Sequence, residues 1–184
     1  MTDEWPKIRA RRTTTISPWV DIIAREVEFA PGGQTQIYHA VGQNDYLAIV
    51  ARTPDGRIPV VRQYRPAIEA FAWELPAGLV ESGEDPATAA ARELLEETGY
   101  STKVIHPLGP PTAACTGRLS NHSHSFFVET GELAGSFTPE PGLTVALKTP
   151  AELAAMIKSG TFSQQLHLGA LMLAQLHSFL TLPK

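Results

Sequence analysis

Four charged residues in one short segment, Arg92, Glu93, Glu96 and Glu97, are the strongest chemical feature of the sequence. The segment is expected to be helical, and Glu93 and Glu97 then share one face because they are four positions apart. Like charges at that spacing destabilise a helix, and its C-terminal half favours cations. A hard divalent cation such as Mg²⁺, which binds carboxylate oxygens and is often shared with substrate phosphates, explains the arrangement. A solvated acidic face of the helix is the alternative.

A wider spacing pattern surrounds these acids. Counting from Gly78, the chain has five residues, a glutamate, seven residues, and then Arg-Glu-Leu-Leu-Glu-Glu-Thr-Gly-Tyr, ending at Tyr100. The pattern resembles the signature of the Nudix hydrolase family, G-x5-E-x7-R-E-U-x-E-E-x-G-U, in which U is a bulky apolar residue. Tyr100 at the last position is the sole departure from it.

The resemblance implies a fold, a reaction and a set of metal ligands. Nudix hydrolases carry a loop–helix–loop motif on an α/β/α sandwich. They cleave nucleoside diphosphates linked to another moiety, with Mg²⁺ or Mn²⁺ as the cofactor. By position, Glu93 and Glu97 would be the main metal ligands, with Glu96 in support and the backbone carbonyl of Ala77 as a further ligand.

The sequence on both sides of this motif is similar to that of the ADP-ribose and nucleoside-diphosphate-sugar pyrophosphatases, over most of the chain. Two segments carry the similarity: Arg-Gln-Tyr-Arg, which ends at Arg65, and Glu-Leu-Pro-Ala-Gly, which begins at Glu74. Arg65 matches the arginine that contacts the phosphates or ribose of the substrate, and Glu74 is assigned to substrate binding with it. The alternative for Arg65 is a surface ion pair with Glu69 or Glu74.

Two aromatic residues and a second arginine complete the substrate contacts that the resemblance implies. Trp19 and Tyr38 match positions where this subgroup stacks aromatic side chains on the base, often one from each subunit of a dimer. Such stacking is worth ~1–3 kcal/mol per base and is weakly selective. Arg118 lies in residues 116–121, which resemble the substrate loop. The alternative for each aromatic residue is a place in the core or at a dimer contact.

The resemblance also implies supporting residues and a general base. Arg92 would hold the glutamates in place, and Glu84 would orient water or aid metal binding. In this subgroup a glutamate on a late loop often activates water. Here that residue is Glu140, whose flanking prolines would stiffen its placement, and Glu129 and Glu132 are the rival candidates.

The elements before the central helix are expected to be strands. From residue 16 to residue 128 the chain contains short apolar runs separated by turn residues. Asp55-Gly56, between the runs 46–53 and 58–64, predicts a β-hairpin because glycine adopts positive φ without steric cost. The first fifteen or so residues are polar and predict a flexible or partner-packed arm.

Helix ends are marked clearly in the second half of the chain. Asp85 is expected to cap the central helix, Pro86 suits its first position and Gly99 suits its end. Two further helices are predicted near the C-terminus, one capped by Thr149 and one by Ser163. The order of elements predicts an α+β fold, here a Nudix-type α/β/α sandwich with a mixed sheet, N-terminal antiparallel strands and two C-terminal helices.

Length, composition and charge limit the class to which this protein can belong. The chain has 184 residues, of which 43% are hydrophobic and 18% charged, and this fits a globular domain. We expect a dimerisation region over residues 1–44 and a Nudix domain over residues 45–184. The formal net charge of −4 argues against nucleic acid and anionic membranes as partners, and no apolar run approaches the ~20 residues of a membrane helix. The expected protein is a cytoplasmic homodimer that acts on a small nucleotide sugar.

The leading prediction is Mg²⁺-dependent hydrolysis of the pyrophosphate bond of ADP-ribose or a related nucleoside diphosphate sugar. The products would be a nucleoside monophosphate and a sugar phosphate. The first alternative is a Nudix activity on nucleoside triphosphates, dinucleoside polyphosphates or coenzyme A. The second is a nucleotide-sugar sensor, although such modules typically lose the glutamates that are present here. A Nudix-like isomerase is more remote, because its cysteine nucleophile would need support that the lone Cys115 does not show.

Overall fold

A computed structural model describes residues 5–183, which divide into two compact units. The first unit contains the described residues up to Asn44 together with residues 113–122. The second contains residues 45–112 and the chain from residue 123 onwards. No helix among residues 5–183 is long and apolar enough to cross a membrane.

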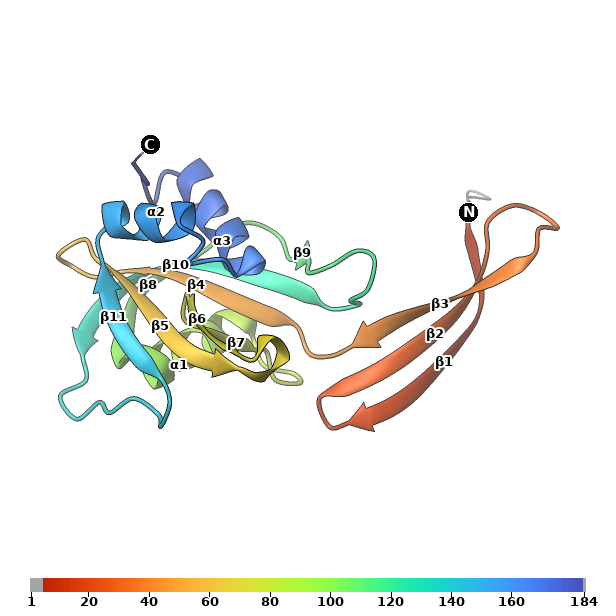
Figure 1. Ribbon diagram of the computed structural model, residues 1–184, viewed down its shortest axis with the longest axis horizontal. Helices are drawn as coiled ribbons and strands as arrows, with labels where there is room; N and C mark the ends of the chain where they lie inside the picture. Colours follow the sequence, from red (N-terminus) through yellow and green to blue (C-terminus); the bar gives the residue numbers. More distant parts are fainter. Residues whose placement is uncertain (1–4, 184) are drawn as a thin grey trace. The chain divides into compact units, whose positions relative to one another are not determined.

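The first unit is built on an antiparallel sheet of three strands (Figure 1). Its strands, in their order across the sheet, are β1 (Lys7–Ser17), β2 (Val20–Glu28) and β3 (Thr35–Gly42). The flexible form of the predicted arm is therefore wrong over its described residues, because β1 begins at Lys7. Packing of this segment against a partner stays a prediction. Most of β1 is exposed and rich in arginine and threonine, so it lacks the apolar alternation that marks a strand in sequence. Pairing with β2 and the strand preference of threonine account for it.

The second unit contains two sheets. Its strands are β4 (Tyr46–Arg52), β5 (Ile58–Arg65), β6 (Ala70–Glu74), β7 (Ala77–Leu79), β8 (Tyr100–Pro107), β9 (Thr112–Ala113), β10 (His122–Leu133) and β11 (Thr144–Lys148), with a 3₁₀ turn at Pro66–Ile68. One residue each of β9 and β10, Ala113 and His122, belongs to the first unit. One sheet has the order β7-β4-β10-β8 and is mixed, because β4 runs parallel to β10 and antiparallel to β7. The other has the order β11-β5-β6 and is antiparallel.

The Asp-Gly turn forms, but the hairpin predicted around it is wrong. Gly56 has a φ of 82°, and the Thr53 amide donates to the Arg57 carbonyl oxygen at 2.9 Å. After this turn, β4 and β5 belong to different sheets. β4 is buried along most of its length and pairs with β7 and β10, so partners distant in sequence replace the adjacent strand.

The described residues contain three α-helices, α1 (Pro86–Thr98), α2 (Pro150–Lys158) and α3 (Gln165–Leu176). Asp85 caps α1 by accepting a backbone N–H at 3.0 Å, and Gly99 ends it with a φ of 75°. Thr149 forms the expected capping box at α2. The predicted cap at Ser163 is wrong by one residue, because α3 begins after Gln164, whose side chain accepts an amide at 2.9 Å.

The mixed sheet lies between α1 on one face and α2 and α3 on the other (Figure 1). Alternate residues of β4 face opposite sides, as in any strand. On one side, the buried residues of β4 pack with those of α1: Leu47, Ile49, Ala51, Ala89, Ala90 and Leu94. On the other side they pack with α3: Ala48, Val50, Ala170, Leu171 and Ala174. The predicted α+β class and the α/β/α sandwich are therefore confirmed.

Candidate active site

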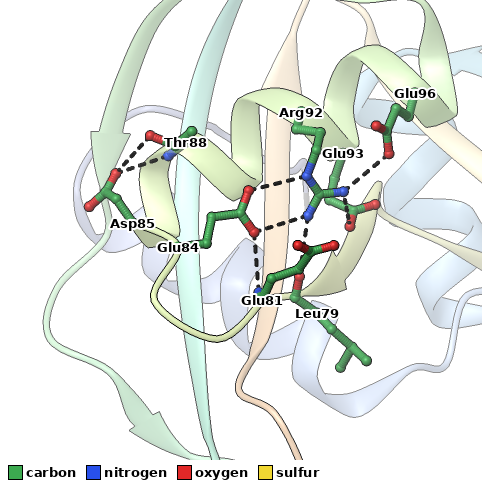
Figure 2. A network of polar contacts seen from close by, with 8 residues as sticks. All are labelled: Leu79, Glu81, Glu84, Asp85, Thr88, Arg92, Glu93 and Glu96. Atoms are coloured by element: carbon green, nitrogen blue, oxygen red, sulfur yellow. Dashed lines mark hydrogen bonds and ion pairs between the residues drawn. The ribbon is translucent and has the colours of Figure 1, made fainter. Parts of the chain in front are cut away.

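Arg92 lies at the centre of a network of carboxylates at α1 (Figure 2). Its Nε and Nη2 donate to the two oxygens of Glu84, each at 3.2 Å. Its Nη1 donates to Glu93 at 2.8 Å and to Glu96 at 3.1 Å. The hydrogen bonds to Glu84 are the main cause of a raised Arg92 pKa, and they hold the pKa of Glu84 below its ordinary value. One guanidinium thus connects the loop before α1 to two carboxylates of the helix.

Glu84 is fixed from a second direction. The Glu81 amide donates to its Oε2 at 3.2 Å, and its own amide donates to the Glu81 carbonyl oxygen at 3.0 Å. Both carboxylate oxygens of Glu84 therefore have partners within the chain. In this arrangement Glu84 holds Arg92, and Arg92 in turn contacts the helix glutamates.

The backbone of β7 lies directly against Glu93. A side-chain carbon on Gly78 would overlap the Glu93 carboxylate, so glycine is the residue that fits there. The Glu93 side chain is only 15% exposed, and burial raises its pKa against the opposing effect of Arg92. The close approach at Gly78 therefore limits where the first carboxylate of α1 can lie.

The backbone of β7 also binds Glu97 of α1, at the residue that precedes Gly78. The Ala77 amide donates to Glu97 Oε2 at 3.0 Å. Burial raises the pKa of Glu97 to about 7, the Ala77 hydrogen bond opposes that rise, and the charge of Glu93 adds to it. The carboxylates of Glu93 and Glu97 are thus both partly buried beside β7. A positive charge there would offset the cost of burying them and their mutual repulsion.

The chemistry of these donors fits a hard divalent cation. Mg²⁺ and Mn²⁺ prefer carboxylate and carbonyl oxygens, and Glu93, Glu97 and the backbone at Ala77 lie together. Residues 5–183 contain no ready-made group of three acidic, histidine or cysteine side chains that could hold a metal ion. Glu93 is hydrogen-bonded to Arg92 and Glu97 to Ala77, so metal binding would require these side chains to exchange partners.

Arg65 and Glu74 form a pair across the antiparallel strands β5 and β6. Arg65 Nε lies 3.1 Å from each Glu74 oxygen, and the guanidinium makes a second ion-pair contact through Nη2. Glu74 is buried, and its hydrogen bonds raise the pKa of Arg65. The charges of both residues also act on Glu97, so the pair shares one electrostatic environment with the helix glutamates. The ion pair with Glu74, one of the alternatives that the sequence left open, is therefore present. It uses the Nε–H and one N–H of Nη2, so most of the five N–H groups of Arg65 remain for a ligand.

His167 supports this region and was not assigned to it from sequence. It is buried on α3, and its Nδ1 accepts a hydrogen bond from the Leu75 amide at 3.1 Å. Burial lowers the pKa of His167 to about 4, so the ring is neutral and can accept. It fixes the backbone between Glu74 and Ala77. The available signal was a single histidine at the start of an otherwise apolar run.

The general-base candidates lie in different surroundings. Glu140 is exposed on the loop before β11, and its side chain has no hydrogen bond or ion pair within residues 5–183. Its carbonyl oxygen accepts the Leu143 amide at 3.0 Å, which closes a turn. Glu129 is paired with Arg52 at 3.2 Å. Glu132 is exposed beyond the buried part of β10. Of the three, Glu140 is the one on a loop and without a cation partner in the described chain.

The remaining predicted site residues belong to the first unit. Trp19 is 67% exposed and Tyr38 is 49% exposed, so neither has the place in the core that the sequence left open. Tyr38 and Arg118 line one surface hollow, and Trp19 does not belong to its lining. The structure thus brings Tyr38 and Arg118 together, without Trp19.

Comparison with known proteins agrees with the fold. The family model for the NUDIX domain matches residues 43–163, and the chain belongs to that family. A CMP-5'-(N-acetyl-N-hydroxy-3-aminopropyl)phosphonate hydrolase of Streptomyces rubellomurinus is 34% identical over 131 residues, which are 71% of this chain and 62% of that protein. An ADP-ribose pyrophosphatase of Bacillus subtilis is 39% identical over 86 residues, 47% of this chain and 46% of that protein.

These matches span less than two thirds of either relative's length. A solved structure described as an ADP compounds hydrolase has a TM-score of 0.79 with 20% sequence identity. It covers 94% of this chain and 93% of its own. At that identity the likeness concerns the fold alone, and it includes both units described here.

Proposed function

We propose that the protein is a nucleotide-sugar pyrophosphatase, with ADP-ribose as the leading substrate. The observation that carries the proposal is the pair of partly buried carboxylates, Glu93 and Glu97, packed against β7 beside the Arg65–Glu74 pair. Such a set offers oxygen ligands for a cation and a guanidinium for phosphate within one electrostatic environment. The ADP-ribose and ADP-sugar pyrophosphatases among the relatives support the choice of substrate.

In this proposal, Mg²⁺ or Mn²⁺ is held by Glu93 and Glu97, with Glu96 and the carbonyl oxygen of Ala77 in support. A bound divalent cation would neutralise phosphate charge and make water a stronger nucleophile. Arg92 keeps the glutamates near β7, and its contacts with Glu93 and Glu96 support that role.

Proton transfer and substrate binding use other residues. Glu140 accepts the proton of the attacking water, and its freedom from cation partners in the described chain supports the assignment. Arg65, held by Glu74, binds a phosphate or ribose oxygen of the substrate. Arg118 contacts the nucleotide, and the exposed rings of Trp19 and Tyr38 stack on its base.

A homodimer is part of the proposal. The first unit exposes several large apolar side chains, and exposed apolar patches mark protein–protein interaction surfaces. These residues include Ile8, Ile16, Trp19, Phe29, Ile37 and Tyr38. Neighbouring residues of a strand face opposite sides, so Ile37 and Tyr38 lie on opposite faces of the three-stranded sheet. A second copy of the chain would cover the face that contains Ile37. The cytoplasmic location expected from the sequence stays a prediction.

Product analysis tests the activity. The protein is incubated with Mg²⁺ and, separately, ADP-ribose, UDP-glucose, GDP-mannose, ATP and a CMP-linked phosphonate, with Glu97→Gln as the inactive control. AMP and ribose 5-phosphate, absent with Glu97→Gln, are the expected products. Turnover of ATP alone would replace the proposal by another Nudix activity. Tight binding without turnover would favour the sensor. The CMP compound is included because the relative from Streptomyces matches the longer stretch of this chain.

A further inference from the structure

The loop that carries Glu140 is joined to the C-terminal end of α1. This loop comprises residues 134–143, between β10 and β11. At its start, the Ala134 amide donates to the Gly99 carbonyl oxygen at 2.8 Å. Gly99 is the residue that ends α1, and it follows Glu97 after one intervening residue. The loop therefore begins at the end of the helix that carries the glutamates of the site.

A phenylalanine ring packs against this end of the helix. A side-chain carbon on Gly99 would lie 2.6 Å from Phe137 Cβ and 2.7 Å from its Cδ1, whereas non-bonded carbon atoms normally approach to about 3.5–4.0 Å. Gly99 therefore has two effects: its φ of 75° ends α1, and its missing side chain leaves the space that the ring fills. Phe137 is half-buried there, although its neighbours Ser136 and Thr138 are exposed.

Glu140 lies three residues after this ring. Three residues extend over at most about 10 Å, so an anchor at Phe137 limits how far the Glu140 backbone can move from α1. The ring of Pro139 fixes one backbone angle between them, and the Leu143 amide closes a turn on the Glu140 carbonyl oxygen at 3.0 Å. Within residues 5–183 the Glu140 side chain has no partner, so its backbone determines where the carboxylate can reach.

The ring is the part of this anchor that a substitution can remove. The backbone hydrogen bond from Ala134 to Gly99 remains in any variant at Phe137, as does the bond from the Phe137 amide to the Ala134 carbonyl oxygen at 3.1 Å. Without the ring, the last attachment to α1 before Glu140 is at Ala134, six residues away. Six residues extend over as much as ~20 Å, so the space open to the Glu140 backbone doubles in reach.

We infer that Phe137 is a positioning residue, whose ring on Gly99 keeps Glu140 within reach of the attacking water. The inference rests on the proposed function, in which Glu140 accepts the proton of that water. It goes beyond that function by giving a role to an apolar side chain outside the proposed ligands and substrate contacts, and a second role to Gly99. Because the ring serves proton transfer rather than binding, its loss lowers kcat and leaves KM for ADP-ribose nearly unchanged.

Steady-state kinetics on ADP-ribose with Mg²⁺ test the inference. Phe137→Ala removes the ring, and Phe137→Leu keeps much of its apolar bulk. Leu133→Ala is the matched control, because Leu133 is 53% exposed at the end of β10, next to the same loop. Glu140→Gln, alone and combined with Phe137→Ala, shows whether the ring acts through Glu140. Hydrogen–deuterium exchange of residues 134–143 without substrate measures the anchor itself, and circular dichroism checks that every variant is folded.

Phe137→Ala is expected to lower kcat by about tenfold to a hundredfold, with KM within about twofold of wild type. Phe137→Leu should recover most of the loss, and Leu133→Ala should match wild type. Exchange in residues 134–143 should become faster in Phe137→Ala and stay unchanged in Leu133→Ala. In the Glu140→Gln background, removal of the ring should lower kcat no further, because no carboxylate remains to be positioned.

Three results would overturn the inference. Unchanged exchange in Phe137→Ala would mean that the ring does not anchor the loop. A further loss of kcat in the Glu140→Gln background, as large as in wild type, would mean that the ring acts on the site by another route. Full activity of Glu140→Gln would remove both the inference and the assignment of Glu140 as the base. Absence of ADP-ribose hydrolysis by wild type would instead overturn the proposed function, and the exchange measurement, which needs no turnover, would still decide whether Phe137 anchors the loop.

Discussion

His167 is expected to make the folded protein sensitive to mild acid. Its pKa is lowered from an ordinary value of 6.5 to about 4, chiefly because burial opposes a charged ring. Protonation therefore favours the unfolded state, in which the ring titrates normally. The stability that the neutral ring provides is complete above pH 6.5 and is lost as the pH falls from 6.5 towards 4. At about 1.4 kcal/mol for each tenfold change in proton affinity, the full loss is about 3 kcal/mol.

Urea unfolding followed by circular dichroism at pH 7.5 and pH 4.5 measures this effect. Between these two values His167 alone should lower the free energy of unfolding by about 2 kcal/mol. His167→Gln keeps an acceptor for the Leu75 amide but cannot take a proton in this range. Its stability should therefore fall by about 2 kcal/mol less than that of wild type, even if it starts lower at pH 7.5.

Carboxylates also titrate in this range, so the difference between the two proteins is the informative quantity. His177→Gln serves as the matched control, because His177 is exposed at the end of the same helix. It should keep the wild-type dependence on pH. Equal loss of stability in wild type and His167→Gln would refute the reasoning, since it would mean that His167 titrates alike in both states or is not buried.

Three further predictions concern the site and the dimer. Gly78→Ala should lower kcat on ADP-ribose by about a hundredfold, because the added carbon displaces the Glu93 carboxylate. Gly135→Ala is the control and should leave kcat unchanged, because Gly135 has open space around it. Equal activity of both variants would contradict this. Arg92→Lys should weaken Mg²⁺ activation by roughly 10–100-fold, since one ammonium group cannot replace the guanidinium contacts to Glu84, Glu93 and Glu96. A titration of the rate against Mg²⁺ measures this change. An unchanged midpoint would mean that Arg92 does not position the glutamates. Ile37→Lys, on the exposed sheet, should shift a dimer to monomer in light scattering with little change in circular dichroism; a persistent dimer would move the interface elsewhere.

Local chemistry made much of α1 predictable. Asp85 and Gly99 end the helix as the capping rules require, because a cap depends on residues within a few positions of one another. The spacing from Gly78 to Glu97 likewise predicted which carboxylates belong together. It could not show that Gly78 lies against Glu93, because that contact depends on how β7 packs on the helix.

Non-local pairing explains most of what the sequence did not reveal. β1 is a strand because β2 lies beside it, and its own polar sequence gives little sign of this. The Arg65–Glu74 contact was one of two open choices, and the side-chain hydrogen bonds of the structure decide for Glu74. Strand pairing alone would not decide it, because the register of β5 and β6 places Arg65 opposite Ala70 and Val61 opposite Glu74. On α1, Ala89, Ala90 and Leu94 are buried, whereas Leu95 is 45% exposed. The small alanines let the helix approach the sheet closely, and this contact depends on residues far away in the sequence.

The turn at Pro54–Gly56 has a consequence for engineering the protein. A hairpin turn normally sets the register of its two strands, so added residues there shift every pair in the ladder. Here β4 and β5 leave the turn into separate sheets, and each takes its register from other strands. Pro54 and Asp55 are exposed, and the turn's own hydrogen bonds involve only its immediate neighbours. This exposed turn is therefore a natural attachment point for an inserted peptide tag or a fluorescent label, since lengthening it leaves both sheets in register.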